Sequence, residues 1–333
     1  VSLIGIYGLG LISFLGCIAF ALFFYKIRYG FYALTPLLLF FIYSIFVVTL
    51  FSNKKNSFLS VRVVQPSIQQ DEKWDKKLKS QHLEKLIKLS LVENNNFNPS
   101  IIIWPESAFP YSSSLLEQKT NIFDWLKSNQ ILITGATRTN FKNNKLTNIY
   151  NSAYIIDHSE QSRIFYDKIK LVPFGEYNPF KKFINFKKMT DGALGFSSGQ
   201  GVNTFYLSNV NYKIGLLICY EIIFSGQVIN GTRPDVLINI TNDAWYGDTN
   251  GPIQHLASAR ARAIEEGLPL VRSANTGVSA VIDGNGRFIE RLEIGKEGVL
   301  DIYVPITSKR TIFSIYGNKI YSLILIFMLM LAR

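Results

Sequence analysis

The 333-residue chain contains only two cysteines, Cys17 and Cys219. So few cysteines exclude a fold that is held together by a disulfide framework. The three histidines, His82, His158 and His255, have neither the spacing of metal ligands nor cysteine partners, which argues against a zinc site. The sequence also lacks a phosphate loop. We therefore expect a protein that uses no metal and no nucleotide cofactor.

Acidic residues are missing from the amino-terminal end. Residues 1–51 contain Lys26 and Arg28 but no Asp or Glu, and residues 1–25 and 29–51 carry no charge at all. Each uncharged stretch reaches the roughly 20 apolar residues that a membrane-spanning helix needs. A signal peptide would have a shorter apolar core and a basic start. The sequence therefore predicts two transmembrane helices in 1–51, as part of a larger membrane domain.

The carboxyl-terminal end, residues 312–333, is also free of acidic residues. Only 13 uncharged residues follow Lys319 before the final arginine, which is short for a full span. We expect a carboxyl-terminal transmembrane helix that is truncated. The remaining 31 basic and 24 acidic residues lie between residues 52 and 311 and indicate a polar body between two membrane-compatible ends.

The two basic residues Lys26 and Arg28 lie in the short loop between the first two predicted spans. By the positive-inside rule this loop is cytoplasmic, which places the middle of the chain on the outer side of the membrane. An exposed loop is expected around Lys181–Lys188. The basic middle segment suits a lipid surface better than a nucleic acid, given the membrane segments on both sides.

The middle of the chain has the pattern of an α/β domain, predicted over residues 58–307. Short apolar strands ("VRVVQP", "SIIIW", "ILITGAT", "KIGLLIC", "DVLINIT") alternate with helical segments at 74–93, 115–129 and 254–266. The stretch "VSAVIDGNGRFIER" is typical of a hairpin. This alternation predicts a mixed sheet that is covered by helices.

Three chemically active residues each follow a predicted strand: Glu106 in "IIIWPES", Lys168 in "YDKIKLVPFGEY" and Cys219 in "GLLICYE". Each has an ordinary explanation when taken alone. Glu106 is also typical of a helix amino terminus, Lys168 of a solvated surface, and Cys219 of a buried core position. Together, however, they form a coherent set for nucleophilic catalysis.

The chemistry of the set explains why these three residue types belong together. A thiol is mostly protonated near neutral pH and needs a base or a neighbouring cation to become a thiolate. Apolar surroundings next to Trp104 would raise the pKa of Glu106 and suit it to accept the proton. The Lys168 ammonium would favour the thiolate and then stabilise an oxyanion. On this basis Lys168 should serve the chemistry and not folding.

The motifs "WPE", "DKIKLVPFGEY", "ICYE" and "NDAWYGD" resemble the nitrilase, or carbon–nitrogen hydrolase, superfamily. The resemblance implies an α-β-β-α sandwich with Glu106 as general base, Lys168 as oxyanion-stabilising cation and Cys219 as nucleophile. Glu176 and Glu221 match further acidic positions that the family places at the site.

Three more residues take expected roles from the same resemblance. The backbone N–H of Tyr220 would serve the oxyanion. Trp74 and Trp245 match family tryptophans that would line a lipid entrance, with core packing as the alternative. Leu268 stands where some relatives have an arginine, a departure that concerns one contact at the site.

Within the superfamily, the loop "LVPFGEY" and the stretch "GPIQHLASARARAIEEGLPLVRSANTGVSAVID" are most similar to the bacterial inner-membrane enzymes that acylate lipoproteins. This similarity implies a phospholipid acyl donor, a thioester on Cys219, an apolipoprotein acceptor and a catalytic domain on the periplasmic side. Two alternatives remain open at this point. One is a membrane-anchored amidase for a small C–N substrate, and the other is a binding module without activity.

Overall fold

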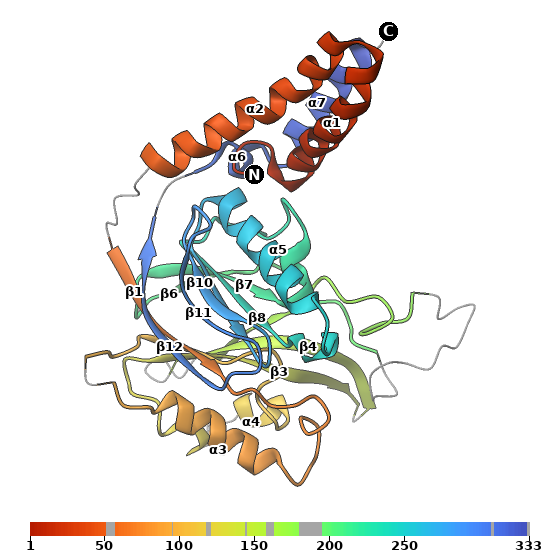
Figure 1. The fold of residues 1–333 in the computed structure, drawn as a ribbon. Helices are drawn as coiled ribbons and strands as arrows, with labels where there is room; N and C mark the ends of the chain where they lie inside the picture. Colours follow the sequence, from red (N-terminus) through yellow and green to blue (C-terminus); the bar gives the residue numbers. More distant parts are fainter. Residues whose placement is uncertain are drawn as a thin grey trace.

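The computed structural model describes residues 1–50, 57–94, 96–117, 121–143, 145–157, 163–179, 195–307 and 310–331. A two-sheet sandwich forms the body of the molecule, and a slender group of helices projects from one end of it (Figure 1). The loop expected around Lys181–Lys188, and His158, lie outside the described residues.

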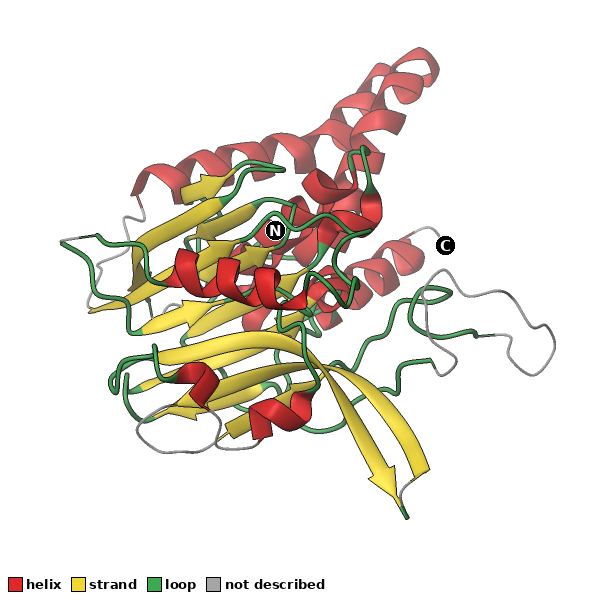
Figure 2. Cartoon of the chain, turned by 90° about the horizontal axis from the view of Figure 1, so that it is seen from below, coloured by secondary structure: helices red, strands yellow, loops and turns green. Residues whose placement is uncertain are grey.

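The first sheet contains six strands in the order β12-β1-β2-β3-β4-β5. Their bounds are β12 (Gly298–Ile306), β1 (Ser57–Gln65), β2 (Ile101–Ile103), β3 (Ile131–Lys142), β4 (Lys145–Asp157) and β5 (Arg163–Asp167). Strands β1, β2 and β3 are parallel, and the remaining pairs are antiparallel. The long β3–β4 hairpin extends beyond its neighbours (Figure 2).

The second sheet has the order β11-β10-β9-β8-β7-β6. Its strands are β6 (Thr204–Leu207), β7 (Tyr212–Ile218), β8 (Val236–Thr241), β9 (Leu270–Ala274), β10 (Ser279–Ile282) and β11 (Phe288–Leu292). Here β7, β8 and β9 are parallel and the outer pairs antiparallel, so the two sheets share one pairing scheme. The predicted hairpin is formed by β10 and β11.

The four layers of the sandwich follow from which face of each strand is apolar. Buried side chains of both sheets, such as Val63, Ile103 and Ile238, meet in one central core. The outer face of the first sheet packs against α3 (Lys79–Ser90) and α4 (Ser113–Glu117). The outer face of the second sheet packs against α5 (Gly251–Glu266). The predicted α-β-β-α sandwich is confirmed.

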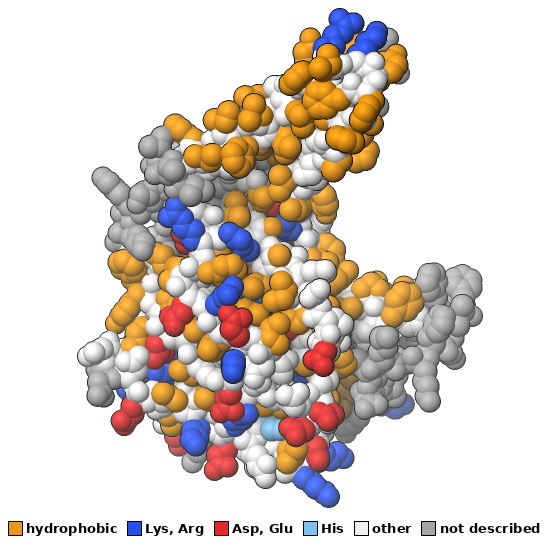
Figure 3. Space-filling view, in the orientation of Figure 1, with side chains coloured by type: hydrophobic (Ala, Val, Ile, Leu, Met, Phe, Trp, Pro, Cys, Tyr) orange, Lys and Arg blue, Asp and Glu red, His pale blue; other side chains and the backbone are white. Residues whose placement is uncertain are grey.

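The apolar ends of the chain form the projecting helices. These are α1 (Gly5–Tyr25), α2 (Ile27–Leu50), α6 (Ile312–Tyr316) and α7 (Lys319–Leu331). Helices α1 and α2 are long and apolar enough to cross a membrane, with mean hydropathies of 2.2 and 1.7 over the qualifying stretches. Apolar side chains cover this part of the surface, whereas charged ones are spread over the sandwich (Figure 3). Helix α7 has 13 residues, which agrees with the short tail expected from the sequence.

Two helices differ from the sequence prediction. The segment 115–129 does not form one long helix. Among its described residues, only the end of α4 is α-helical and Asn121–Phe123 form a 3-10 turn. Asp124 and Ser128, which follow this turn, have low helix propensity. The helix expected from residue 74 begins only at Lys79, after a series of turns.

Candidate active site

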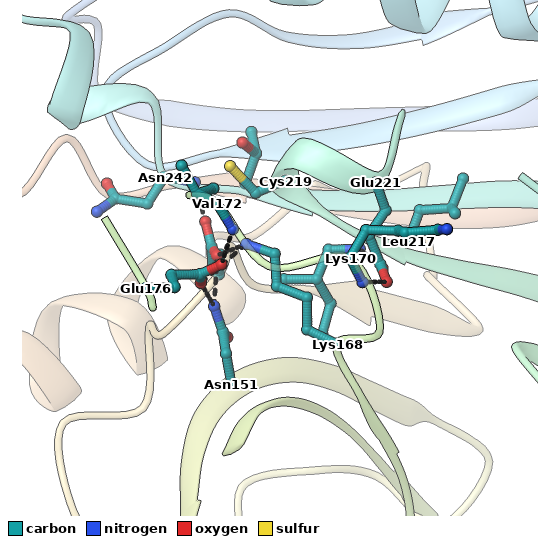
Figure 4. Close-up of polar contacts among 12 residues, drawn as sticks. Asn151, Lys168, Lys170, Val172, Glu176, Leu217, Cys219, Glu221 and Asn242 are labelled. Atoms are coloured by element: carbon teal, nitrogen blue, oxygen red, sulfur yellow. Dashed lines mark hydrogen bonds and ion pairs between the residues drawn. The ribbon is translucent and has the colours of Figure 1, made fainter. Parts of the chain in front are cut away.

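The predicted catalytic residues meet because their strands end at the same edge of the sandwich. Strands β2 and β5 of the first sheet are followed by Glu106 and Lys168, and β7 of the second sheet by Cys219. Figure 4 shows Lys168, Asn151 and Glu176 converging on one point, with the sulfur of Cys219 turned toward it. The three strand ends that the sequence singled out therefore lie together.

Lys168 forms the centre of a buried cluster of charges. Its ammonium lies 3.3 Å from Oε1 of Glu106 and 3.0 Å from Oε1 of Glu176. The residue is only 1 % exposed, so its interpretation as a solvated surface lysine is wrong. Burial opposes the charge, but the two carboxylates and Cys219 outweigh it and raise the pKa of Lys168 above its ordinary value. Lys168 is thus held as a cation.

Glu106 is held in place by several donors. Its Oε1 accepts a hydrogen bond of 2.7 Å from the side chain of Asn151, and its Oε2 accepts one of 2.8 Å from the backbone of Asn242. Gly135 in β3 allows this approach, because a Cβ there would lie 2.3 Å from the nitrogen of Ser107 and 2.6 Å from Cα of Glu106. No helix of the described chain begins at Glu106, so the helix-terminus interpretation is wrong.

The expected raised pKa of Glu106 is also wrong. Burial does raise it, but the Lys168 ammonium, the Asn151 hydrogen bond, Lys73 and the Asn242 amide together lower the pKa below its ordinary value. The sequence shows the apolar neighbours of Glu106 but not the distant cations that the fold brings to it. Glu106 is therefore a carboxylate in the resting site.

Cys219 is buried and has a strained backbone. Its φ of 48° lies in the left-handed region, which is unfavourable for a residue with a side chain. Burial, followed by the negative charge of Glu106, raises the pKa of the thiol to about 12, although Lys168 lowers it. Cys219 is therefore a thiol in the resting site.

Glu221 connects the loop after β5 with the end of β7 through hydrogen bonds. Its Oε1 accepts hydrogen bonds from the hydroxyl of Tyr166 and from the backbone of Ile169, both at 2.8 Å, while its Oε2 accepts one from the backbone of Ile218. Glu176 acts in a similar way, since its Oε2 accepts a 2.8 Å bond from the backbone of Val172. Both acidic residues lie where the sequence placed them.

The two predicted tryptophans are not core residues. Trp74 and Trp245 are each 51 % exposed, which rules out the core-packing alternative. Tyr220 directly follows the nucleophile and packs its ring against Phe224. Leu268, in contrast, lies in the core between α5 and the second sheet, before the start of β9 and thus at the end opposite the site. Leu268 therefore makes no contact with Glu106, Lys168 or Cys219 and packs in the core instead.

Lys73 is a site residue that sequence reasoning missed. Its Nζ donates a 3.0 Å hydrogen bond to the backbone carbonyl of Glu106, and its side chain is buried. Burial lowers the pKa of Lys73 from 10.5 to about 8, against the opposing effect of Glu106. Lys73 precedes the helix that was predicted from residue 74, and its contact with Glu106 is formed only in the fold.

The shifted pKa of Lys73 predicts a particular pH dependence of stability. Between pH 8 and 10.5 the unfolded chain holds a proton on Lys73 that the folded chain has lost, so folding stability should rise with pH across this window. The rise should total at most about 3 kcal/mol. Denaturant unfolding in detergent should show that the free energy of unfolding of the wild type, relative to that of Lys73→Met, increases from pH 8 to 10.5. If this difference in free energy were constant between these pH values, the lowered pKa of Lys73 would be contradicted.

The comparison with known families agrees with this geometry. The family model described as "Carbon-nitrogen hydrolase" matches residues 60–311. The chain belongs to the carbon–nitrogen hydrolase family. A solved structure, Saccharomyces cerevisiae Nit3 of the nitrilase superfamily, is similar in fold, with a TM-score of 0.52 at 17 % identity over 75 % of this chain and 90 % of that one.

Two similar proteins are bacterial and carry the same name. The apolipoprotein N-acyltransferase of Rickettsia prowazekii is 39 % identical over 278 residues, which cover 82 % of this chain and 55 % of that protein. The apolipoprotein N-acyltransferase of Rhodopseudomonas palustris is 40 % identical over 290 residues, covering 82 % and 53 %. The chain thus spans about half the length of the curated relatives it matches.

Proposed function

We propose that the chain is the catalytic part of an apolipoprotein N-acyltransferase. It would move a fatty acyl chain from a phospholipid, through a thioester on Cys219, to the amino-terminal amine of a diacylglyceryl-cysteine. The observation that carries this proposal is the buried Glu106–Lys168 pair beside a strained cysteine, in a chain that is 39–40 % identical to enzymes of that name.

In the first half-reaction Glu106 accepts the proton of the Cys219 thiol as the sulfur attacks the ester carbonyl carbon of the phospholipid. Because Glu106 is ionised and the thiol has a raised pKa, proton transfer and attack occur together and no free thiolate accumulates. The Lys168 ammonium and the Tyr220 N–H stabilise the resulting oxyanion. The C–O bond then breaks, Glu106 returns the proton to the leaving alcohol, and the acyl group stays on sulfur.

In the second half-reaction the amine of the acceptor attacks the thioester carbonyl. Glu106 takes a proton from the attacking nitrogen, and a second oxyanion forms at the same donors. The C–S bond then breaks, and Glu106 gives this proton to the leaving sulfur, which regenerates the thiol. The site therefore serves two substrates in turn, which is a ping-pong route.

The remaining site residues support these steps. Glu176 holds Lys168 in place, since both Lys168 and Asn151 donate to its Oε1, at 3.0 and 2.9 Å. Glu221 keeps the loop after β5 against β7. The exposed rings of Trp74 and Trp245 offer an apolar entrance for an acyl chain.

The proposal also gives each part of the chain a role. Residues 58–307 would form the catalytic domain, residues 1–51 two membrane helices of a larger membrane domain, and residues 312–333 a carboxyl-terminal membrane helix. The enzyme would lie in the bacterial inner membrane with its catalytic domain on the periplasmic side, where donor and acceptor are lipid-anchored.

The location predicts where protease can reach the chain. Lys142 and Lys145 are exposed at the tip of the β3–β4 hairpin, so trypsin added to spheroplasts should cut there. Replacing both lysines with glutamine should remove that fragment and serves as the control. Cleavage that requires a permeabilised membrane would mean that the domain faces the cytoplasm.

The rival proposal is an amidase that hydrolyses a small C–N substrate with the same residues. A synthetic diacylglyceryl-cysteine peptide with a free amine, mixed with phospholipid vesicles and the protein, decides between the two. The transferase should increase the peptide mass by one acyl chain, whereas a peptide with an acetylated amine should stay unchanged. Release of ammonia from simple amides without peptide acylation would favour the amidase.

A further inference from the structure

We infer that His255 is a positioning residue that orients the oxyanion-binding peptide of the nucleophile; this rests on the proposed acyl-transfer chemistry. His255 lies in the first turns of α5 and is buried. Its Nε2 lies 3.1 Å from the backbone carbonyl oxygen of Cys219. Since a carbonyl oxygen can only accept, Nε2 carries the hydrogen and donates.

The bonded carbonyl belongs to the same peptide group as the N–H of Tyr220. A trans peptide is planar, with its C=O and N–H pointing in opposite directions. A donor that holds the carbonyl therefore also sets the direction of the N–H. A hydrogen bond to the carbonyl further polarises the peptide and makes its N–H a better donor, as in any chain of hydrogen bonds. His255 thus acts on the oxyanion without touching it.

A rigid charged network keeps the imidazole in this orientation. Nδ1 of His255 lies 2.9 Å from Oδ1 of Asp243 and 3.1 Å from the guanidinium of Arg272. The same guanidinium donates a 2.7 Å hydrogen bond to Oδ2 of Asp243. Burial opposes ionisation of Asp243, but Arg272 and His255 lower its pKa to about 2, so it stays a carboxylate. Gly277 leaves room for it, because a Cβ there would lie 2.2 Å from Oδ2.

The strained conformation of Cys219 explains why such support is needed. A residue with φ of 48° persists only where its surroundings over-determine it. The bond from His255 fixes the peptide that follows this residue, and Glu221 fixes the backbone that precedes it. The histidine was dismissed as a metal ligand at the sequence level, and its contact with Cys219 arises only from the packing of α5.

Two substitutions of His255 distinguish the role of its Nε2 from that of its Nδ1. Glutamine at position 255 places its amide nitrogen where Nε2 was and keeps the donor to the Cys219 carbonyl. Asparagine places its amide near Nδ1 and keeps only the side that faces Asp243. His255→Gln should therefore retain acylation, whereas His255→Asn should slow it by about 10- to 100-fold, since losing an oxyanion donor outright costs roughly 10²–10³.

The test compares two reactions of the same thiol. Acylation by p-nitrophenyl butyrate forms an oxyanion, whereas alkylation by iodoacetamide displaces iodide and forms none. In His255→Asn, the acylation rate constant should fall while the alkylation rate and the unfolding temperature stay near those of wild type. Equal losses in both reactions, or equal acylation in Asn and Gln variants, would overturn the inference.

The activated ester also separates this inference from the proposed function. If wild type reacts with the ester but transfers nothing from phospholipid, the proposed substrate is wrong while the role of His255 is still measured. If His255→Asn does not fold, His255→Gln decides alone. Acylation near the wild-type rate supports the donor role, and a 100-fold loss at an unchanged unfolding temperature contradicts it.

Discussion

Cys219→Ser should abolish acylation of the lipopeptide. Removing the nucleophile of a covalent mechanism typically lowers the rate by roughly 10⁴–10⁶-fold. A hydroxyl at this position would be buried next to the Glu106 carboxylate, as the thiol is, and would be far harder to deprotonate. Transfer measured by mass spectrometry of the peptide should fall to background.

The second cysteine provides the matched control for this variant. Cys17 lies in α1 and is exposed at the helix surface, away from the charged cluster. Cys17→Ser should therefore acylate the peptide at the wild-type rate. Transfer by Cys219→Ser at a comparable rate would remove the thiol from the mechanism.

Lys168→Met should have the second largest effect, on both activity and stability. Loss of one oxyanion-stabilising donor costs roughly 10²–10³ in rate. The sequence alone predicts no effect on folding, but the structure corrects this, because the ammonium pairs with two buried carboxylates. Removing one member of a buried charge pair typically costs about 3–5 kcal/mol. Single-turnover acylation and denaturant unfolding measure the two effects separately.

A neighbouring lysine shows whether the effect is specific to the buried position. Lys170 is exposed, and its ammonium lies over the ring of Phe224, 5.6 Å from the ring centroid. Lys170→Met should leave both acylation and stability close to wild type. Because Lys168 lowers the pKa of Cys219, Lys168→Met should also react more slowly with iodoacetamide at neutral pH. Near-normal acylation by Lys168→Met would show that the cation is not used.

Local patterns predicted β-strands covered by helices because several strands have their own signal, whereas the α-β-β-α sandwich was expected from the family resemblance. The run "IGLLI" is apolar throughout, and in the structure this part of β7 is buried on both faces, in the central core and against α5. The prediction of one helix over 115–129 was wrong because apolar residues at a helical period do not by themselves secure a helix: Asn121–Phe123 form a 3-10 turn. The shared pairing scheme of the two sheets leaves no visible repeat in the sequence.

The proximity of Glu106, Lys168 and Cys219 could be predicted because each one lies close after a strand, and these strands end at one edge of the sandwich. Residues that reach the site only through tertiary contacts could not be predicted from the sequence. Lys73 reaches the site from a turn, and His255 reaches it from a helix on the outer layer. The prediction of a raised pKa for Glu106 was wrong for the same reason, since the charge that lowers this pKa belongs to Lys168, which follows a distant strand. Apolar neighbours are visible in a sequence, whereas neighbours brought by folding are not.

The intact mass of the protein after incubation with phospholipid vesicles tests the central claim most directly. Without an acceptor peptide, the thioester on Cys219 should accumulate and add the mass of one fatty acyl chain. Neutral hydroxylamine should remove the added mass, and Cys219→Ser should not acquire it. A wild-type protein that acylates the peptide without ever carrying an acyl group, or an acyl group found equally on Cys219→Ser, would contradict the account.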